Sequence, residues 1–143
     1  SDQPDDISIF FNTIVTSGAG IITSNPRNKS ASPYQITHNA IFAGKPQPKL
    51  GLAKNNLVYD YQLAQQYLIQ PYLPPGQLNL NLIFQNPIVP KLNNLPLQNY
   101  LDWNVDFDGK ISDQRFGAYI NEKMPRWYPN LEIKPILTKQ KNN

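Results

Sequence analysis

Proline is spread along the whole chain, and it limits the folds that the chain can adopt. Of 143 residues, 14 are Pro, and they occur from Pro4 to Pro135. Each Pro fixes its own φ angle and lacks a backbone N–H donor, so it interrupts helices and central strands. The proline share is roughly twice the usual ~5%. The sequence therefore excludes long helices and favours short elements joined by Pro-rich connections.

The remaining composition is that of a folded chain. Hydrophobic residues make up 40% and aromatic residues 11%, which supplies the apolar side chains that disordered segments lack. The length of 143 residues fits one domain with a single core. We expect an exposed leader over residues 1–6, one globular domain over residues 7–137, and a flexible basic tail over residues 138–143.

Charge and hydropathy narrow the classes of partner. The net charge is +3, without a clustered basic face, so nucleic-acid binding is not expected. No run approaches the ~18 apolar residues of a membrane-spanning helix. The opening "SDQPDD" is typical of the exposed segment that follows a removed signal or a membrane anchor. These features predict an extracytoplasmic protein, periplasmic, cell-surface or secreted, with a membrane anchor upstream as one form.

The first third of the chain has the pattern of short strands. Residues 7–16 alternate Ile and Phe with smaller residues, and branched and aromatic side chains of this kind favour strands. We predict two strands on either side of "SGAG" at 17–20, with Gly18 and Gly20 in a turn or bulge. Residues 34–44 predict a third strand.

The middle of the chain predicts one helix and one strand. Residues 57–70 place an apolar stripe at helical spacing, formed by Leu57, Tyr61, Ala64 and Leu68. Residues 77–86 alternate, with Leu78, Leu80, Leu82 and Phe84 on the dry face, while the other face is mostly wet and carries Gln77, Asn79, Asn81 and Gln85. A strand with one wet face favours an antiparallel or edge position. We therefore predict an α+β fold: a mainly antiparallel β-sheet, one or two helices and long Pro-rich connections.

An acidic loop is the sharpest chemical feature. Calcium loops place oxygen ligands at positions 1, 3 and 5, a Gly at 6, a hydrophobe at 8 and a bidentate acid at 12. With Gly109 at position 6, the sequence supplies a candidate set of metal ligands: Asn104, Asp106, Asp108, Ser112 and Asp113. The first half of this stretch resembles the calcium loops of EF-hand and dockerin-type modules. That resemblance implies a single weak Ca²⁺ site, followed by an exit helix over residues 112–124.

The same stretch also fits a plain turn. Position 12 of the loop is Arg115, a cation where calcium loops carry an acid, and no second loop is present to pair with it. Gly109 tolerates positive φ, as a tight turn requires. In that turn Asp106 faces Lys110, and Val105 faces Ile111. The turn is the favoured interpretation, and the calcium site is the alternative.

Two further features bear on function. Arg126, Trp127 and Tyr128 lie between two Pro residues and form a candidate aromatic platform for a protein or carbohydrate ligand. His38 is the one His, and the chain has no Cys, so a usual zinc site or a thiol nucleophile is not available. A hydrolase would need His38 to meet an Asp in a pocket.

The functional expectation is a non-enzymatic module. Neutral polar residues lose less on desolvation than ions, so a chain rich in Asn and Gln suits contacts made by loops and sheet edges. We expect a structural or binding domain, secreted or anchored to the cell envelope, that acts through protein–protein contacts in a surface assembly. The alternative is a ligand-binding module that uses the calcium loop or the aromatic platform, and no cofactor beyond that Ca²⁺ is expected.

Overall fold

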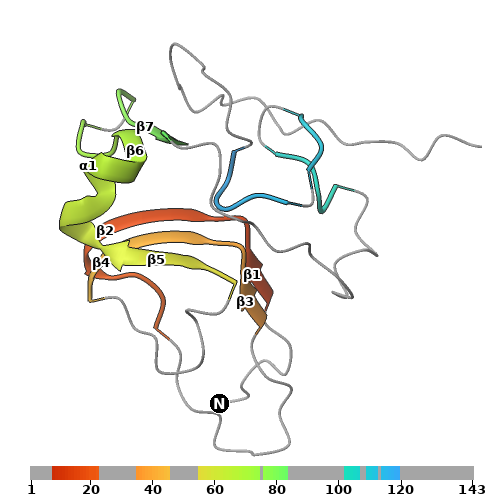
Figure 1. Ribbon diagram of the computed structural model, residues 1–143, viewed down its shortest axis with the longest axis horizontal. Coiled ribbons are helices and arrows are strands. Elements are labelled where there is room, and N and C mark those ends of the chain that lie inside the picture. Colours follow the sequence, from red (N-terminus) through yellow and green to blue (C-terminus); the bar gives the residue numbers. More distant parts are fainter. Residues whose placement is uncertain are drawn as a thin grey trace, which may run out of the picture.

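The computed structural model describes residues 8–22, 35–45, 55–74, 76–83, 102–106, 109–112 and 114–119. Their elements, in chain order, are β1 (Ser8–Phe10), β2 (Thr13–Ala19), β3 (Gln35–Thr37), β4 (Ala40–Lys45), β5 (Leu57–Asp60), the 3-10 helix η1 (Tyr61–Leu63), α1 (Ala64–Tyr67), β6 (Leu68–Gln70) and β7 (Asn79–Leu82). The fold is strand-rich and mixed, with one short α-helix in the described residues (Figure 1).

The first five strands pair in parallel, so the prediction of a mainly antiparallel sheet is wrong. β1 pairs with β3, and a second sheet has the order β2-β4-β5. β6 and β7 form the one antiparallel pair of strands among the described elements, as the alternation over 77–86 predicts. Parallel pairing needs long crossover connections between strands. The Pro-rich stretches that separate β2 from β4 and β4 from β5 are long enough to provide them.

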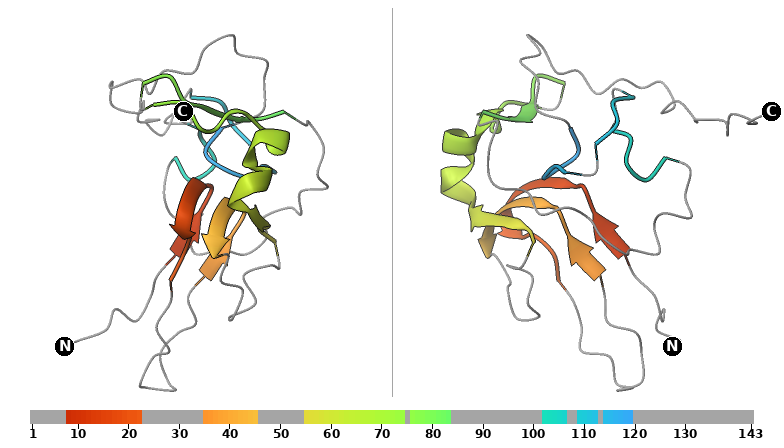
Figure 2. Two further views of the ribbon diagram at one scale, coloured as in Figure 1. Left: turned by 90° about the vertical axis from the view of Figure 1, so that its left-hand side faces the viewer. Right: turned by 45° about the vertical axis from the view of Figure 1, so that its right-hand side comes forward.

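The parallel strands form three stacked rungs. We define rung 1 as residues 8–19, rung 2 as residues 35–45 and rung 3 as residues 55–60. Each of the first two rungs contains two strands joined at a sharp corner, so β1 and β3 are set at an angle to the three-stranded sheet (Figures 1 and 2). Rung 3 begins at its corner and continues into β5.

Each corner contains one residue with positive φ followed by an Asn. The φ angles are 53° at Phe11, 57° at His38 and 64° at Asn55. This left-handed conformation is costly for non-glycine residues and is found where the surrounding structure holds it in place. Its recurrence at the same level of all three rungs makes the corners equivalent.

The inside of the bend is filled by aliphatic side chains in register. Ile9 pairs with Ile36 across β1 and β3, while Ile14, Ile41 and Val58 are paired across the larger sheet. Ile21, Ile41 and Ala43 form the buried centre of this cluster, and the other aliphatic residues pack against it. Burial of these groups out of water stabilises the stack.

The outer face of the same sheet is covered by the second half of the described chain. Ala40 and Phe42 of β4 are fully buried there, together with Ala64 and Leu68. β4 is therefore apolar on both faces over its first four residues. Leu80 and Leu82 of β7 pack against this cluster from the other side.

The predicted helix over 57–70 is mostly wrong. Its first four residues form β5 and its last three form β6, which leaves three residues in the 3-10 helix η1 and four in α1. Asp60 caps the intervening turn, because its side chain accepts a 2.9 Å hydrogen bond from the Gln62 N–H. The run Leu57–Tyr59 pairs with β4 in the sheet, and this pairing overrides the helical spacing of the apolar residues.

Two other expectations are corrected. β2 continues through "SGA" to Ala19, with a bulge between Thr16 and Ala19, so "SGAG" does not separate two strands. In β7 the predicted wet face is buried, since Asn79 and Asn81 are 4% and 3% exposed while Leu80 and Leu82 are half-buried. Ser112 and residues 114–119 are not helical, and residues 113 and 120–124 of the predicted exit helix lie outside the described residues.

Candidate functional site

The corners are joined by a ladder of asparagine side chains. Asn12 donates to the Oδ1 of Asn39 from its backbone N–H and from its Nδ2, both at 3.0 Å. Asn39 repeats both bonds to the Oδ1 of Asn56, at 2.9 Å and 3.0 Å. Each step of the ladder therefore uses the same two donors and the same acceptor.

The ladder also ties each corner to the strand of the rung before it. The Asn39 Nδ2 lies 3.0 Å from the Ile9 carbonyl oxygen, and the Asn56 Nδ2 lies 2.8 Å from the equivalent carbonyl of Ile36. Backbone bonds repeat in the same way, because Ala40 N–H donates to Asn12 and Leu57 N–H donates to Asn39. Asn39 is fully buried, and these bonds satisfy its amide, which would otherwise destabilise the fold.

The ladder ends in solvent at rung 1. Asn12 is exposed, and no donor in the described part of the chain is bonded to its Oδ1. The bond from Ala40 N–H to the Asn12 carbonyl also fixes the direction of the β2 backbone. In this parallel register the N–H and C=O groups of Thr13 and Val15 point away from β4. Within the described residues, no strand pairs with that outer edge of β2.

A strap formed by residues 114–119 crosses the outside of the corners. The Gly117 N–H donates to the carbonyl of His38, and the Ala118 N–H donates to the Thr13 Oγ1 at 3.1 Å. Gly117 has a φ of 79°, and a Cβ placed on it would come within 2.4 Å of the Thr13 hydroxyl oxygen. The strap therefore requires Gly at this position to approach the sheet. Phe116 enters the core beside Phe42.

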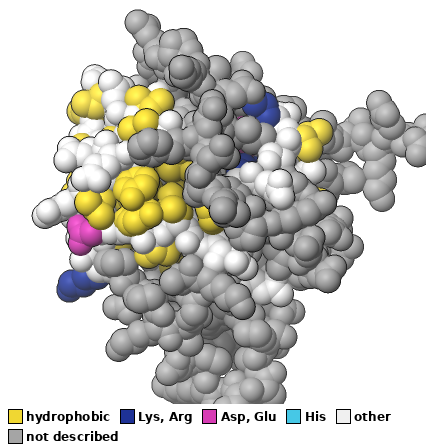
Figure 3. Space-filling model, viewed as in Figure 1, with side chains coloured by type: hydrophobic (Ala, Val, Ile, Leu, Met, Phe, Trp, Pro, Cys, Tyr) yellow, Lys and Arg dark blue, Asp and Glu magenta, His cyan; other side chains and the backbone are white. Residues whose placement is uncertain are grey.

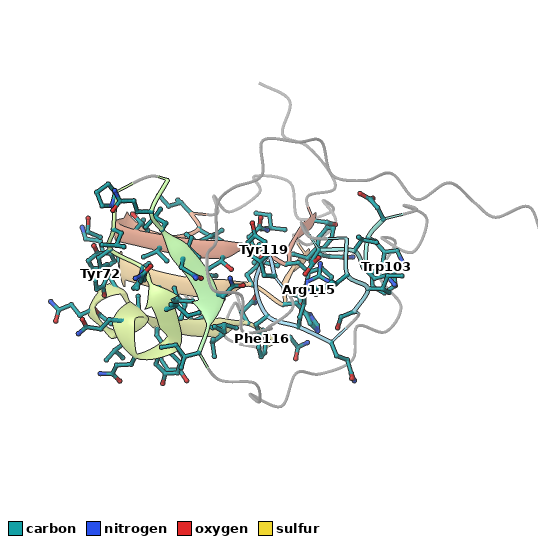
Figure 4. All side chains as sticks on the ribbon, turned by 90° about the horizontal axis from the view of Figure 1, so that it is seen from above. Tyr72, Trp103, Arg115, Phe116 and Tyr119 are labelled. Carbon is teal, nitrogen blue, oxygen red and sulfur yellow. The ribbon has the colours of Figure 1, made fainter. Side chains whose placement is uncertain are left out.

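Arg115 links the strap to the acidic loop. Its Nη1 donates to the carbonyls of Asn104 and Ser112 at 3.0 Å and 2.6 Å, and its Nη2 lies 3.3 Å from the Val105 carbonyl. The guanidinium carbon lies 3.9 Å from the centre of the Phe11 ring, which is a cation–π geometry. Figure 4 shows Arg115 and Phe116 between Trp103 at one end of the molecule and Tyr72 at the other.

Arg115 remains charged in this buried position. Burial lowers the pKa of Arg115 to about 10, and the nearby Asp106 carboxylate opposes part of that shift. A pKa of about 10 keeps the guanidinium protonated at neutral pH. The acidic loop therefore encloses a permanent cation that belongs to the chain itself.

The plain turn predicted for the acidic loop is confirmed. Val105 and Ile111 form an isolated antiparallel bridge, and the Asp106 N–H donates to the Lys110 carbonyl at 2.8 Å. The Asp106 Oδ1 accepts a hydrogen bond from the Lys110 N–H at 2.8 Å, and Gly109 has a φ of 81°.

The structure describes three of the five candidate calcium ligands. Asn104 offers its carbonyl to Arg115 and to the Ser112 N–H, while Asp106 caps the turn. Asp108 and Asp113 lie outside the described residues. Across the described ranges, no group of three or more acidic or His side chains is placed to hold a metal ion.

The residues of the predicted aromatic platform, Arg126, Trp127 and Tyr128, lie outside the described residues. His38 is described and is only 2% exposed. Its Nδ1 lies 2.8 Å from the Thr37 hydroxyl, and its ring lies between the rings of Phe11 and Phe116 at 5.6 Å and 6.1 Å. His38 is therefore a buried corner residue in contact with aromatic rings.

A second exposed surface lies at the other end of the sheet. Tyr61 and Tyr72 have ring centres 4.9 Å apart, and Tyr59 and Tyr67 are stacked at 4.3 Å. Several large apolar side chains nearby in the chain are more than a third exposed: Ile69, Tyr72, Leu73 and Ile83. Figure 3 shows hydrophobic side chains gathered around α1 and the adjoining strands.

Comparison with known proteins adds no relative. No protein-family model matches the chain, and no curated protein or solved structure gives a significant match. In the described part of the chain, no helix combines the length and the apolarity needed to cross a bilayer.

The asparagine ladder is not among the features predicted from the sequence, although the three corners share a short sequence pattern. The three corners read "FNTIV", "HNAIF" and "NNLVY", each an Asn followed two residues later by Ile or Val. Their spacings of 27 and 17 residues differ, so a search for a fixed period does not detect them.

Proposed function

We propose that the chain is a non-enzymatic structural or binding module that acts through protein–protein contacts outside the cytoplasm, as part of a secreted or envelope-anchored protein. The observation that carries this proposal is the outer edge of rung 1, where no strand pairs with β2 in the described residues and the corner Asn12 is exposed. A sheet edge with free backbone groups is a template for pairing with another strand. The exposed Asn12 at its corner adds an amide acceptor to that edge.

The tyrosine-rich surface supports the same function. Tyr and other large side chains are enriched at the centres of protein interfaces, because they bury much area with little loss of conformational freedom. Tyr72 and Leu73 are exposed there, and Tyr72 is held in place by its hydroxyl bond to the Tyr61 carbonyl. The extracytoplasmic location stays a prediction from sequence.

A photo-crosslinking amino acid tests the proposal in cells that produce the protein naturally. Placed at Ser17, it occupies an exposed position on β2, and placed at Ile111, it occupies an exposed position in the acidic turn, outside both surfaces, as a control. We expect a discrete adduct with another protein from position 17, in the secreted or envelope fraction, and none from position 111. Adducts confined to the cytoplasmic fraction, or none from position 17, would contradict the proposal.

A calcium-binding function is not favoured by the described geometry. The cationic Arg115 side chain already binds three carbonyl groups around the loop, where a Ca²⁺ ion would need oxygen ligands and would meet a like charge. The carbohydrate alternative rests on Arg126, Trp127 and Tyr128 and stays a prediction from sequence.

A further inference from the structure

The rungs repeat one set of hydrogen bonds, and the set is incomplete at rung 1. In both steps of the ladder, the corner of one rung donates its backbone N–H and its Asn Nδ2 to the Asn Oδ1 of the next. The Oδ1 of Asn39 and that of Asn56 each receive such a pair of donors. The Asn12 Oδ1 is the equivalent acceptor in rung 1, and among the described residues it receives neither.

The backbone of β2 is incomplete in the same direction. Neighbouring rungs are joined by backbone hydrogen bonds, in which the Ala40 N–H donates to the Asn12 carbonyl and the Leu57 N–H donates to the Asn39 carbonyl. The outward residues Thr13 and Val15 carry the N–H and C=O groups that a further parallel strand would use. The strap bonds the hydroxyl of Thr13, and Asn12 remains exposed beside it.

The bend also determines which side chains a further rung would carry. Ile9 and Ile14 lie on the inside of the bend and continue the columns of Ile36 and Ile41. A strand added on rung 1 would place an aliphatic side chain over each of them. Its corner Asn would stand between these two aliphatic residues, as Asn39 stands between Ile36 and Ile41.

From this continuity we infer that rung 1 binds an extended segment of a different protein chain, which adds as a fourth parallel rung. The segment has the pattern aliphatic-x-x-Asn-x-aliphatic, and its Asn donates from its N–H and Nδ2 to the Asn12 Oδ1. This inference rests on the proposed function, because it specifies the partner chemistry of the same edge. Specificity comes from the corner amide, and affinity comes from the strand hydrogen bonds and the aliphatic columns.

A synthetic peptide tests the inference on the full chain. The probe is the rung 2 sequence QITHNAIFAGK, residues 35–45, with blocked termini and a fluorescent label. Its Asn would align with Asn12 and its two Ile residues with Ile9 and Ile14. We expect saturable binding by fluorescence anisotropy, and slowed amide hydrogen exchange at Thr13 and Val15 on binding.

A change in the peptide tests the hydrogen bonds at the corner by themselves, because the protein stays unaltered. Replacing the peptide Asn by Ala removes the Nδ2 donor, and we expect about tenfold weaker binding. A scrambled peptide of the same composition should not bind. Equal binding by the Ala and Asn peptides, with Val15 still protected, would overturn the corner recognition and leave the proposed function standing.

Changing the protein locates the site. Val15→Pro removes an outward N–H without removing a bond to β4, so it should abolish peptide binding. Val15→Ala is the matched control, because it loses the branched side chain and retains the N–H, and it should bind the peptide.

Three results would contradict the inference. The first is peptide binding that survives Val15→Pro and is lost with Val58→Pro on the opposite edge of the sheet. The second is no peptide binding at all, and the third is self-association of the protein at the β2 edge in place of peptide binding. None of these three depends on whether position 17 crosslinks to a protein in cells, so the proposed function can succeed or fail separately.

Discussion

Single side chains hold the corners of this fold together, and Asn39 is the most important of them. It is fully buried and bonds to both neighbouring rungs, whereas Asn12 occupies the exposed end of the ladder. The loss of a hydrogen-bond partner destabilises a protein more at a buried amide than at an exposed amide, because water can take the place of the lost partner only at the exposed amide. The two Asn residues should therefore differ in their contributions to stability.

Replacing Asn39 with Ala should lower the free energy of unfolding by roughly 3 kcal/mol, since Asn12 and Asn56 each lose a bond inside the protein. The control Asn12→Ala should cost about 1 kcal/mol or less. Urea denaturation followed by circular dichroism measures both values. Equal losses of stability for the two variants would contradict the prediction, because they would show that the buried Asn39 amide stabilises the fold no more than the exposed Asn12 amide does.

Residue chemistry also predicts a pH dependence at the tyrosine-rich surface. A side-chain hydrogen bond with Tyr67, which favours the protonated Tyr59 hydroxyl, raises the pKa of Tyr59 above its ordinary value of 10.0, and burial and the charge of Tyr67 act in the same direction. A raised pKa means that the neutral phenol is favoured in the folded state. Its contribution to stability is complete below pH 10.0 and is lost as the pH rises through the folded pKa.

The corresponding measurement is the melting temperature of the protein between pH 8 and pH 11.5. Wild type should lose more stability above pH 10 than Tyr59→Phe, which cannot ionise at that position. Parallel pH profiles for the two proteins would mean that Tyr59 and Tyr67 do not share a hydrogen bond in solution.

At the scale of elements, Arg115 joins the acidic loop and the strap to the corner of rung 1. Its guanidinium contacts the Phe11 ring and three carbonyl groups of the acidic loop. Removal of this side chain would therefore separate the acidic loop and the strap from the corner of rung 1. The loop is also closed by the bridge between Val105 and Ile111, and the strap is bonded to rung 2 through the Gly117 N–H and the His38 carbonyl. Arg115 should therefore control the local stability of both.

Arg115→Met keeps an apolar side chain of similar length and removes the guanidinium donors. We expect about 2 kcal/mol lower stability, with faster amide exchange at Ser112 and Ala118 than in wild type. Lys45→Met is the control, because Lys45 is an exposed cation at the end of β4. Unchanged exchange at Ser112 in the Arg115 variant would show that the guanidinium does not organise the loop.

The same loop predicts the outcome of metal addition. Because Arg115 supplies a buried positive charge there, millimolar CaCl₂ should leave the melting temperature unchanged relative to a chelator control. A ligand that binds only the folded state must raise that temperature. A clear rise with calcium would restore the metal site implied by the EF-hand and dockerin resemblance.

At the scale of the whole molecule, the chain is a stack of parallel rungs with a short antiparallel pair and a helix packed on its outer face. The unpaired edge of β2 follows from the stack, because the first rung has the same backbone pattern as the second and no rung precedes it in the described residues. The proposed function and the peptide inference both depend on that pattern. They fail if the first three segments of the chain do not pair in parallel.

The sequence predicted local features better than long-range pairing. The turn at Asp106–Lys110, the antiparallel pairing of the strand at 79–82 and the short strands near the start all follow from local patterns. The parallel pairing could not be derived from alternation, since a side chain such as Asn39 is polar and yet fully buried by its bonds to other rungs. The helix predicted over 57–70 is wrong for a related reason, because its first four residues pair with β4 as the strand β5, and this long-range pairing does not follow from local spacing.

The most direct test of the stacked rungs is a NOESY spectrum of the protein with labelled Ile and Val methyl groups. The parallel stack predicts cross-peaks between Ile9 and Ile36, between Ile14 and Ile41, and between Ile41 and Val58, which are the in-register neighbours of the three rungs. A spectrum that lacks these three contacts would contradict the parallel stack and the exposed edge that depends on it.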